Sequence, residues 1–289
     1  MIIENDVLLV EIKSAGAEMT RVYSKTTKLE YLWKGDPTFW GRHAPVLFPI
    51  IGQVKDKTYT VDGNNFHLSQ HGFARDNEFT IINQEPDAVT LELTSSDELT
   101  KVYPFKFALQ VSYSLSNNEL FVSYQVINKD EKEIIFSIGG HPAFNCPLVE
   151  GTSFDDYYLE FPEKETPTQI HLNTQTGLRN GKEEQVDLGN KIDLNYDLFK
   201  NDALIYEGLK SSGVSLLSTK HQHGLTFGFN DWRYLAFWTK EKNAPFVCLE
   251  PWCGITDADD SKGEFKNKLA VENLGVEKRF SIEYSVKLF

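Results

Sequence analysis

Alternation of hydrophobic and polar residues is the main pattern along the chain. In the segment 105–115, FKFALQVSYSL, apolar side chains occupy every odd position and polar ones occupy most of the even positions. A period of two residues is typical of a strand with one buried and one exposed face. The same pattern recurs at 89–93, 225–229 and 280–286, so the sequence predicts a protein built mainly from strands.

Two pairs of these strands are joined by residues that favour tight turns. The sequence SNNE at 116–119 separates the strand above from a second apolar run over 120–127. Within YTVDGNNFHL, Asp62-Gly63 is a preferred pair for a two-residue hairpin turn. Both segments predict antiparallel hairpins.

Helical signals are few. The sequence SSDE before Leu99 predicts a capped helix of one or two turns, which Pro104 would end. Residues 162–200 are polar and weakly patterned, and we interpret them as long connections. We therefore predict an all-β fold, a large antiparallel β-sandwich with few short helices, as a single domain over residues 1–289.

Charge and composition argue against several classes of protein. The chain has 29 Lys and Arg against 42 Asp and Glu, a net charge of −13, whereas a nucleic-acid-binding surface needs a basic patch. It has no apolar run of about 18 residues, the length of a membrane span. Its first residues, MIIENDVLLVEIKS, lack the features of a signal peptide. We expect a cytoplasmic protein with no nucleic-acid or membrane partner.

Cysteine and histidine spacings do not indicate a metal site. Cys146, Cys248 and Cys253 form no repeated CxxC pair, and we interpret them as reduced thiols. His221 and His223 could contact one metal from a strand, but no third ligand accompanies them. The chain has no GxSxG, P-loop or GxGxxG motif. We therefore expect neither a metal nor another cofactor.

Histidine occurs in two segments with unusual backbone chemistry. In GGHPAFN, two glycines permit a bend or a close approach before His141, and Pro142 stiffens the backbone after it. The alternative is a turn histidine that bonds only its own backbone. In QHGFARD, Phe73 lies between the donors His71 and Arg75, a combination that suits a hydroxylated ring. The alternative, favoured for this segment alone, is a core phenylalanine beside a solvated arginine.

Glu250 is an isolated carboxylate in apolar surroundings. It lies in PFVCLEPWCG, and carboxylates are rarely buried without a partner. By itself this residue is explained slightly better as a strand-end glutamate that faces water. Together with a histidine, it would supply the two groups that acid–base chemistry requires.

Five segments, taken in order, resemble the aldose 1-epimerase (galactose mutarotase-like) family, and most closely its shorter, LacX-like bacterial branch. They are WGRHAPVLFPIIG, HGFARD, GGHPAFN, NDALIY and LEPWCGITD, and the resemblance covers nearly the whole chain. It implies the galactose mutarotase-like supersandwich, with a sugar bound in an open cleft on one concave sheet. It also implies a cofactor-independent isomerase that interconverts the α and β anomers of a hexose.

The resemblance implies specific roles for six residues. His141 would be the general acid and Glu250 the general base, and the sugar would be bound by Arg42, His71, Arg75 and Asp202. Asp197 is an alternative to Asp202 because the NDALIY match is short. Full-length family members have an Asn-Arg pair where this chain has Ala44-Pro45, so Arg42 fills that role only approximately.

Three alternatives to an epimerase of free hexoses remain. The same chemistry can act on hexose 6-phosphates, with arginines that grip the phosphate. A non-catalytic sugar-binding protein can use the same scaffold. A glycoside hydrolase or lyase would need a second carboxylate, which the sequence does not place. The sequence makes no prediction of the oligomeric state.

Overall fold

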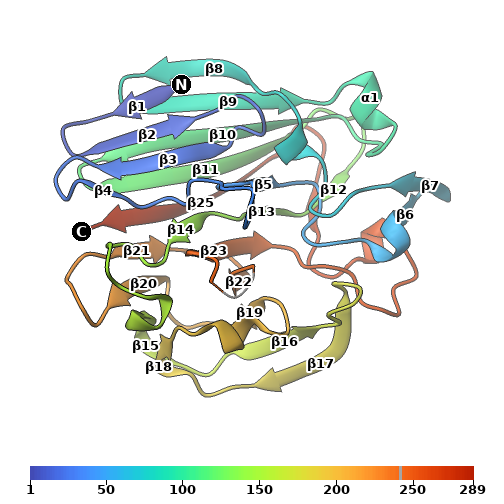
Figure 1. Cartoon of the computed structure of the whole chain (residues 1–289). Helices are drawn as coiled ribbons and strands as arrows, with labels where there is room; N and C mark the ends of the chain where they lie inside the picture. The colour runs from blue at the N-terminus through green and yellow to red at the C-terminus, as the bar shows by residue number, and fades with distance from the viewer. Residues whose placement is uncertain (241–242) are drawn as a thin grey trace.

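The computed structural model describes residues 1–240 and 243–289 and consists mainly of antiparallel strands (Figure 1). Within these residues the largest sheet has nine strands. In spatial order they are β18 (Gly189–Asp193), β15 (Tyr157–Glu165), β20 (Gly213–Ser218), β21 (Leu225–Gly228), β25 (Arg279–Leu288), β11 (Glu119–Asn128), β10 (Phe107–Ser116), β9 (Ala88–Thr94) and β8 (Thr80–Glu85).

A second sheet of eight strands carries most of the segments that the sequence analysis singled out. Seven lie in the order β17 (Arg179–Gln185), β16 (Thr168–Leu172), β19 (Leu204–Glu207), β22 (Tyr234–Trp238), β23 (Phe246–Cys253), β13 (Ile138–Gly140) and β5 (Val46–Leu47). The eighth strand, β14 (Ala143–Asn145), also pairs with β23.

Smaller elements complete the described part of the chain. The N-terminal sheet contains β1 (Ile2–Glu4), β2 (Leu8–Ile12), β3 (Met19–Ser24) and β4 (Leu29–Glu30), and two strand pairs are β6 (Thr58–Val61) with β7 (Asn64–His67) and β12 (Ile134–Phe136) with β24 (Glu272–Leu274). The helix α1 spans Asp97–Thr100, and short 3₁₀ turns span Lys55–Lys57, Ala74–Asp76, Phe154–Asp156, Tyr196–Phe199 and Phe265–Asn267. No helix in the described ranges is both long enough and apolar enough to cross a membrane.

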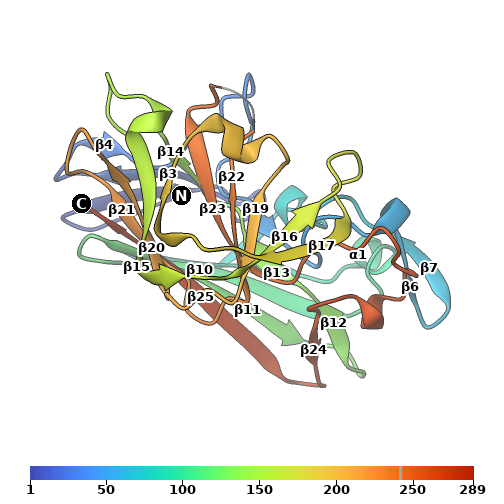
Figure 2. The same ribbon diagram turned by 90° about the horizontal axis from the view of Figure 1, so that it is seen from below.

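The two large sheets enclose a common apolar core. Leu109 and Val122 of the nine-stranded sheet belong to the same buried cluster as Val247 and Leu249 of β23. Figure 2 shows β22 and β23 running across β10, β11 and β25. Sheets packed face to face are the defining feature of a β-sandwich, so the predicted fold class is confirmed.

The predicted hairpins and helix are also confirmed. In the longer hairpin, Ser116 pairs with Glu119 across the turn between β10 and β11. Asp62 and Gly63 join β6 to β7 with φ angles of 50° and 79°, as a type I′ turn requires. Ser96 caps α1 by accepting a hydrogen bond from the Leu99 N–H at 3.3 Å.

The interpretation of residues 162–200 as long connections is wrong. This stretch contains the end of β15 and all of β16, β17 and β18. Six of the seven β17 residues are exposed, because this strand lies at the edge of its sheet and carries mostly polar side chains. β17 is therefore formed by backbone pairing without a buried face, and β16 and β18 each bury only one apolar residue, Ile170 and Ile192. Hydrophobic alternation cannot reveal such strands.

Candidate active site

Strand β23 is buried along its whole length, and its two faces have different surroundings. Val247 and Leu249 pack into the core between the sheets. The alternate residues Cys248, Glu250 and Trp252 lie on the opposite face. Glu250 is therefore in mid-strand with 1% of its surface exposed, which rules out a strand-end glutamate facing water.

His141 lies at an interruption between two strands that both pair with β23. Gly139 of β13 pairs with Trp252, and Ala143 of β14 pairs with Cys248. Between them, the Leu249 N–H donates to the Pro142 carbonyl at 3.1 Å. A side chain at Gly139 would meet the Trp252 ring at 2.8 Å, so a glycine is needed for this close approach. The unusual GGHP sequence thus places His141 opposite Glu250.

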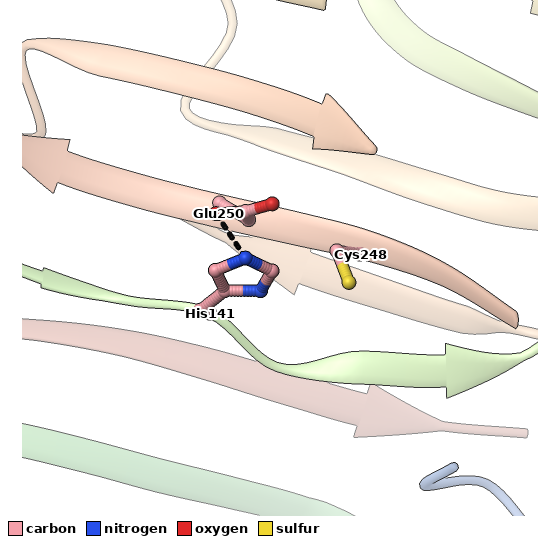
Figure 3. A group of neighbouring side chains, drawn as sticks. All are labelled: His141, Cys248 and Glu250. Carbon is pink, nitrogen blue, oxygen red and sulfur yellow. Dashed lines mark ion pairs between the residues drawn. The ribbon is translucent and has the colours of Figure 1, made fainter. Parts of the chain in front are cut away.

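The imidazole of His141 contacts the carboxylate of Glu250. Figure 3 shows the two side chains facing each other, with His141 Nε2 3.2 Å from Glu250 Oε2. The contact is close enough for an ion pair but not aligned as a hydrogen bond, since Oε2 has no hydrogen-bond partner among the described residues. His141 Nδ1 and Trp252 Nε1 also lack partners within that part of the chain. Hydroxyl groups of a bound ligand can satisfy such atoms.

Burial drives the two groups toward their uncharged forms. It raises the pKa of Glu250 well above its ordinary value, and the negative charge of Asp202 adds to this effect. It lowers the pKa of His141 to about 3, with a smaller contribution from the positive charge of Arg75. The pair therefore shares one proton, and burial favours its location on the carboxyl group.

A cavity of about 450 Å³ opens above this pair, within the size range of small-molecule sites. It is lined by the predicted residues His71, Arg75, His141, Asp202 and Glu250. Asp197 and Arg42 are not among its lining residues. The guanidinium of Arg42 instead donates to Asp76 at 2.8 Å.

His71 is held in a defined orientation and protonation state. Its φ angle is +64°, and the Gly52 N–H donates to its Nδ1 at 3.1 Å. A nitrogen that accepts a hydrogen bond carries no proton, so the proton of the neutral ring lies on Nε2. Burial, together with the charges of His141 and Arg75, lowers the pKa of His71 well below 6.5. His71 is thus an uncharged donor at the cavity.

Arg75 is a partly buried cation beside this donor. Its Nη2 donates to the Gln70 carbonyl at 2.7 Å. Burial lowers its pKa to about 10, so the guanidinium remains charged near neutrality. Phe73, between these two residues in sequence, packs against Phe48 in the core. Phe73 is therefore the core phenylalanine that was favoured for this segment alone, and it does not line the cavity.

Two tryptophans that the sequence analysis did not single out, Trp40 and Trp238, line the cavity beside His141. Trp40 stacks on His141 with ring centroids 4.8 Å apart and planes at 28°, and Trp238 meets the same imidazole edge-on at 5.6 Å. Trp40 begins the WGRHAPVLFPIIG motif, and this was a usable signal. Trp238 lies in an ordinary apolar strand and offers none.

Two lysines also line the cavity and were missed. Lys200 follows the short turn at 196–199, and Lys240 follows β22. Both side chains are exposed at the rim. They belong to none of the segments that suggested a site, so only the fold brings them to the cavity that Arg75 also lines.

Cys248 lies close to the His141–Glu250 pair (Figure 3). Ligand atoms of these three buried residues lie within 4.8 Å of one another, and all three residue types can bind Zn²⁺. Burial and the nearby Glu250, however, raise the pKa of the Cys248 thiol well above its ordinary value, and metals bind the thiolate. This donor set therefore fits a resident metal poorly.

The remaining cysteines and histidines do not suggest a second site. Cys146 and Cys253 are free and buried, and burial raises the pKa of Cys253 to about 12, which makes it a poor nucleophile. The His221 Nε2 forms a hydrogen bond with the Tyr157 hydroxyl at 2.8 Å. His221 therefore has a structural partner.

Comparisons with known proteins agree on one family. The family model described as aldose 1-epimerase matches residues 1–268. The chromosomal LacX protein of Lactococcus lactis subsp. lactis is 37% identical over 262 residues, covering 88% of this chain and 87% of that protein. A galactose mutarotase related enzyme from Lactobacillus acidophilus superposes with a TM-score of 0.96 and 37% identity, covering 100% of this chain and 97% of that chain. A galactose mutarotase-like protein from Lactobacillus casei has a TM-score of 0.94 and 35% identity, with 100% and 99% coverage.

Proposed function

Because the chain belongs to the aldose 1-epimerase family, we propose that it interconverts the α and β anomers of a hexose through acid–base ring opening. The observation that carries this proposal is the contact of His141 with Glu250, at 3.2 Å, beside a cavity of small-molecule size. The contact pairs a proton donor with a proton acceptor at one point, as this isomerisation requires.

In the proposed reaction, Glu250 removes the proton from the C1 hydroxyl while His141 gives a proton to the ring oxygen. The bond between C1 and the ring oxygen breaks, and the C1 hydroxyl oxygen becomes a carbonyl. After rotation about the C1–C2 bond, Glu250 returns its proton to this oxygen and His141 accepts one from the C5 hydroxyl. The ring closes as either anomer, and the pair holds one proton throughout.

The spacing of the pair suits this proton exchange. The two oxygens that exchange protons are both bonded to C1, so the groups that serve them must also be neighbours. A contact of 3.2 Å between Nε2 and Oε2 meets this requirement. The open-chain stage leaves the proton on Glu250 and a neutral His141, which is the arrangement that burial favours. Such acid–base assistance typically accelerates a reaction by about 10²–10⁴-fold.

The cavity residues have complementary roles in this proposal. His71 donates from Nε2 to a sugar oxygen, and Arg75 donates from its guanidinium. Asp202 accepts from a sugar hydroxyl at the same cavity. Arg42 does not line the cavity and is paired with Asp76.

The test is a mutarotation assay with freshly dissolved α-glucose and α-galactose, followed by polarimetry. Glu250→Gln and His141→Asn should each lower kcat by at least about 100-fold while the protein stays folded, because neither new group can exchange the proton. Wild-type rates in Glu250→Gln would refute the assignment of the base. Sugar binding by calorimetry without any acceleration by the wild-type protein would favour the non-catalytic alternative.

A hexose 6-phosphate is the second candidate substrate, and Lys200 and Lys240 favour it. Together with Arg75 they place three cations at the cavity of a chain whose net charge is −13. The free hexose remains our first candidate, because tryptophan faces and neutral donors surround the catalytic pair. A much higher kcat/KM for glucose 6-phosphate or galactose 6-phosphate, lost in Arg75→Ala, would reverse this order.

A further inference from the structure

We propose that the buried ion pair of Lys268 and Asp257, which does not line the cavity, positions His71 for sugar binding. The inference rests on the proposed function, since it assumes that His71 contacts the sugar. Lys268 Nζ donates to Asp257 Oδ1 at 2.8 Å and to the Ile255 carbonyl at 2.6 Å. The two side chains are 3% and 5% exposed. The pair thus fixes the loop that follows β23.

This loop is bonded to a second loop, residues 52–55. Asp257 Oδ2 accepts from the Lys55 N–H at 3.0 Å, and the Asp257 N–H donates to the Gln53 carbonyl at 2.9 Å. Between them, Thr256 Oγ1 accepts from the Gln53 N–H at 3.0 Å. Gln53 and Lys55 of this loop are therefore both bonded to the segment that the ion pair holds.

The second loop is bonded in turn to both the backbone and the ring of His71. The His71 N–H donates to the Gly52 carbonyl at 2.7 Å, and the Gly52 N–H donates to His71 Nδ1 at 3.1 Å. A side chain at Gly52 would lie 2.4 Å from Thr256, so the two loops are in close contact. A shift of the Thr256 loop must therefore move Gly52, and with it the bond that keeps the His71 proton on Nε2.

A stabilising role alone explains the ion pair poorly. Removing two opposite charges from water costs about as much as their attraction returns, so replacing a buried ion pair by neutral groups is often neutral for stability. Besides each other, the two side chains bond the Ile255 carbonyl and the Lys55 N–H, and the Asp257 backbone bonds Gln53 and Arg179. Lys268 and Asp257 are therefore positioning residues. They hold the loops that orient His71, and His71 in turn contacts the sugar.

The experiment compares wild-type protein with the double variant Lys268→Met/Asp257→Asn, which is uncharged and similar in volume. Long-range ¹H–¹⁵N NMR of the histidine rings should show one His71 tautomer in the wild type and a mixture in the variant. We expect KM to rise by about fivefold to tenfold with kcat within about twofold, because His71 binds the sugar in the ground and transition states alike. Asp257→Asn alone is a second variant whose amide oxygen can still accept from Lys55, but it leaves the Lys268 ammonium buried without a counter-charge and should therefore lose more stability than the double variant.

Glu165→Gln is the matched control, because Glu165 is a buried carboxylate that does not line the cavity. Glu165 is fully buried and accepts from the N–H groups of Lys210 and Ser211, both at 2.8 Å. The Glu165→Gln variant should lose thermal stability, while its KM and the NMR signals of the His71 ring should stay unchanged. If the ion-pair variants behave in the same way, the positioning role is refuted. Should the wild-type protein fail to accelerate any mutarotation, the proposed function falls, while the NMR comparison still decides whether the ion pair positions His71.

Discussion

The indole of Trp40 stacks on the imidazole of His141, with ring centroids 4.8 Å apart. An electron-rich ring face stabilises a nearby cation, so this contact favours the imidazolium that the proposed reaction needs. It opposes the effect of burial, which lowers the His141 pKa. The aromatic wall of the cavity therefore acts on the catalytic proton as well as on the shape of the site.

Replacing Trp40 tests this relationship. In Trp40→Leu, the imidazolium loses up to about 2 kcal/mol of cation–π stabilisation, and kcat should fall by up to roughly thirtyfold. Trp40→Phe should lose less, because a weaker π face remains. Mutarotation rates, with folding checked by circular dichroism, decide the point. Equal rates in the Leu and Phe variants would show that the stack does not assist catalysis.

Asp202 and Asp197 form a matched pair of substitutions. Asp202 lines the cavity and Asp197 does not, although they are five positions apart. Asp202→Asn should raise KM by roughly tenfold, since one hydrogen bond from a sugar hydroxyl to a charged acceptor contributes about 1.5–3 kcal/mol. Asp197→Asn should leave KM unchanged. Steady-state kinetics on the same hexose separate them, and the reverse pattern would exchange their roles.

The pair of His141 and Glu250 should reduce stability in opposite ways at the two ends of the pH range. The raised pKa of Glu250 means that, above the unfolded value of about 4.3, the folded state keeps a proton that the unfolded state releases. Stability is therefore lost as pH rises from that value toward the folded pKa. The lowered pKa of His141 has the opposite sign, and stability is lost as pH falls from about 6.5 toward about 3.

Thermal unfolding of two variants across pH checks both signs. Each unit of pKa shift corresponds to about 1.4 kcal/mol. The Tm of Glu250→Gln relative to wild type should rise between pH 5 and pH 8. The relative Tm of His141→Asn should rise from pH 8 to pH 5. Relative Tm values that do not depend on pH would mean that the pKa shifts are absent.

The proposed chemistry needs no metal, and this can be tested directly. After exhaustive dialysis against EDTA, we expect kcat and KM to be unchanged, because His141 and Glu250 exchange protons without a Lewis acid. Metal analysis of the same sample should find no stoichiometric zinc on Cys248. Activity that disappears with EDTA and returns only with added zinc would contradict the expectation.

Hydrophobic alternation predicted the strands that have one buried face, and it failed where that condition does not hold. The strands at 107–116 and 279–288 follow it, whereas β17 is exposed on nearly every position. β23 fails in the opposite way, because all its residues are buried. A strand with both faces covered shows no alternation, so Glu250 looked like a strand-end residue.

The candidate site was predictable where the chemistry lies in one short motif. His141, His71 and Glu250 stand in segments with unusual backbone or charge, and the structure brings all three to one cavity. Trp238 and Lys240 come from a segment without any such feature. They reach the cavity only because β22 pairs with β23. The position of such residues depends on the order of the strands in the sheet, and no local sequence pattern predicts that order.

The two-faced burial of β23 has a consequence for how this protein tolerates change. In a library with every substitution along 246–253, selection for protein abundance should remove variants at Val247 and Leu249, which fill the core. Selection for enzymatic turnover should remove variants at Glu250 even where abundance is normal. Along this one strand, folding would then constrain the residues that face the core, and catalysis would constrain Glu250 on the alternate face.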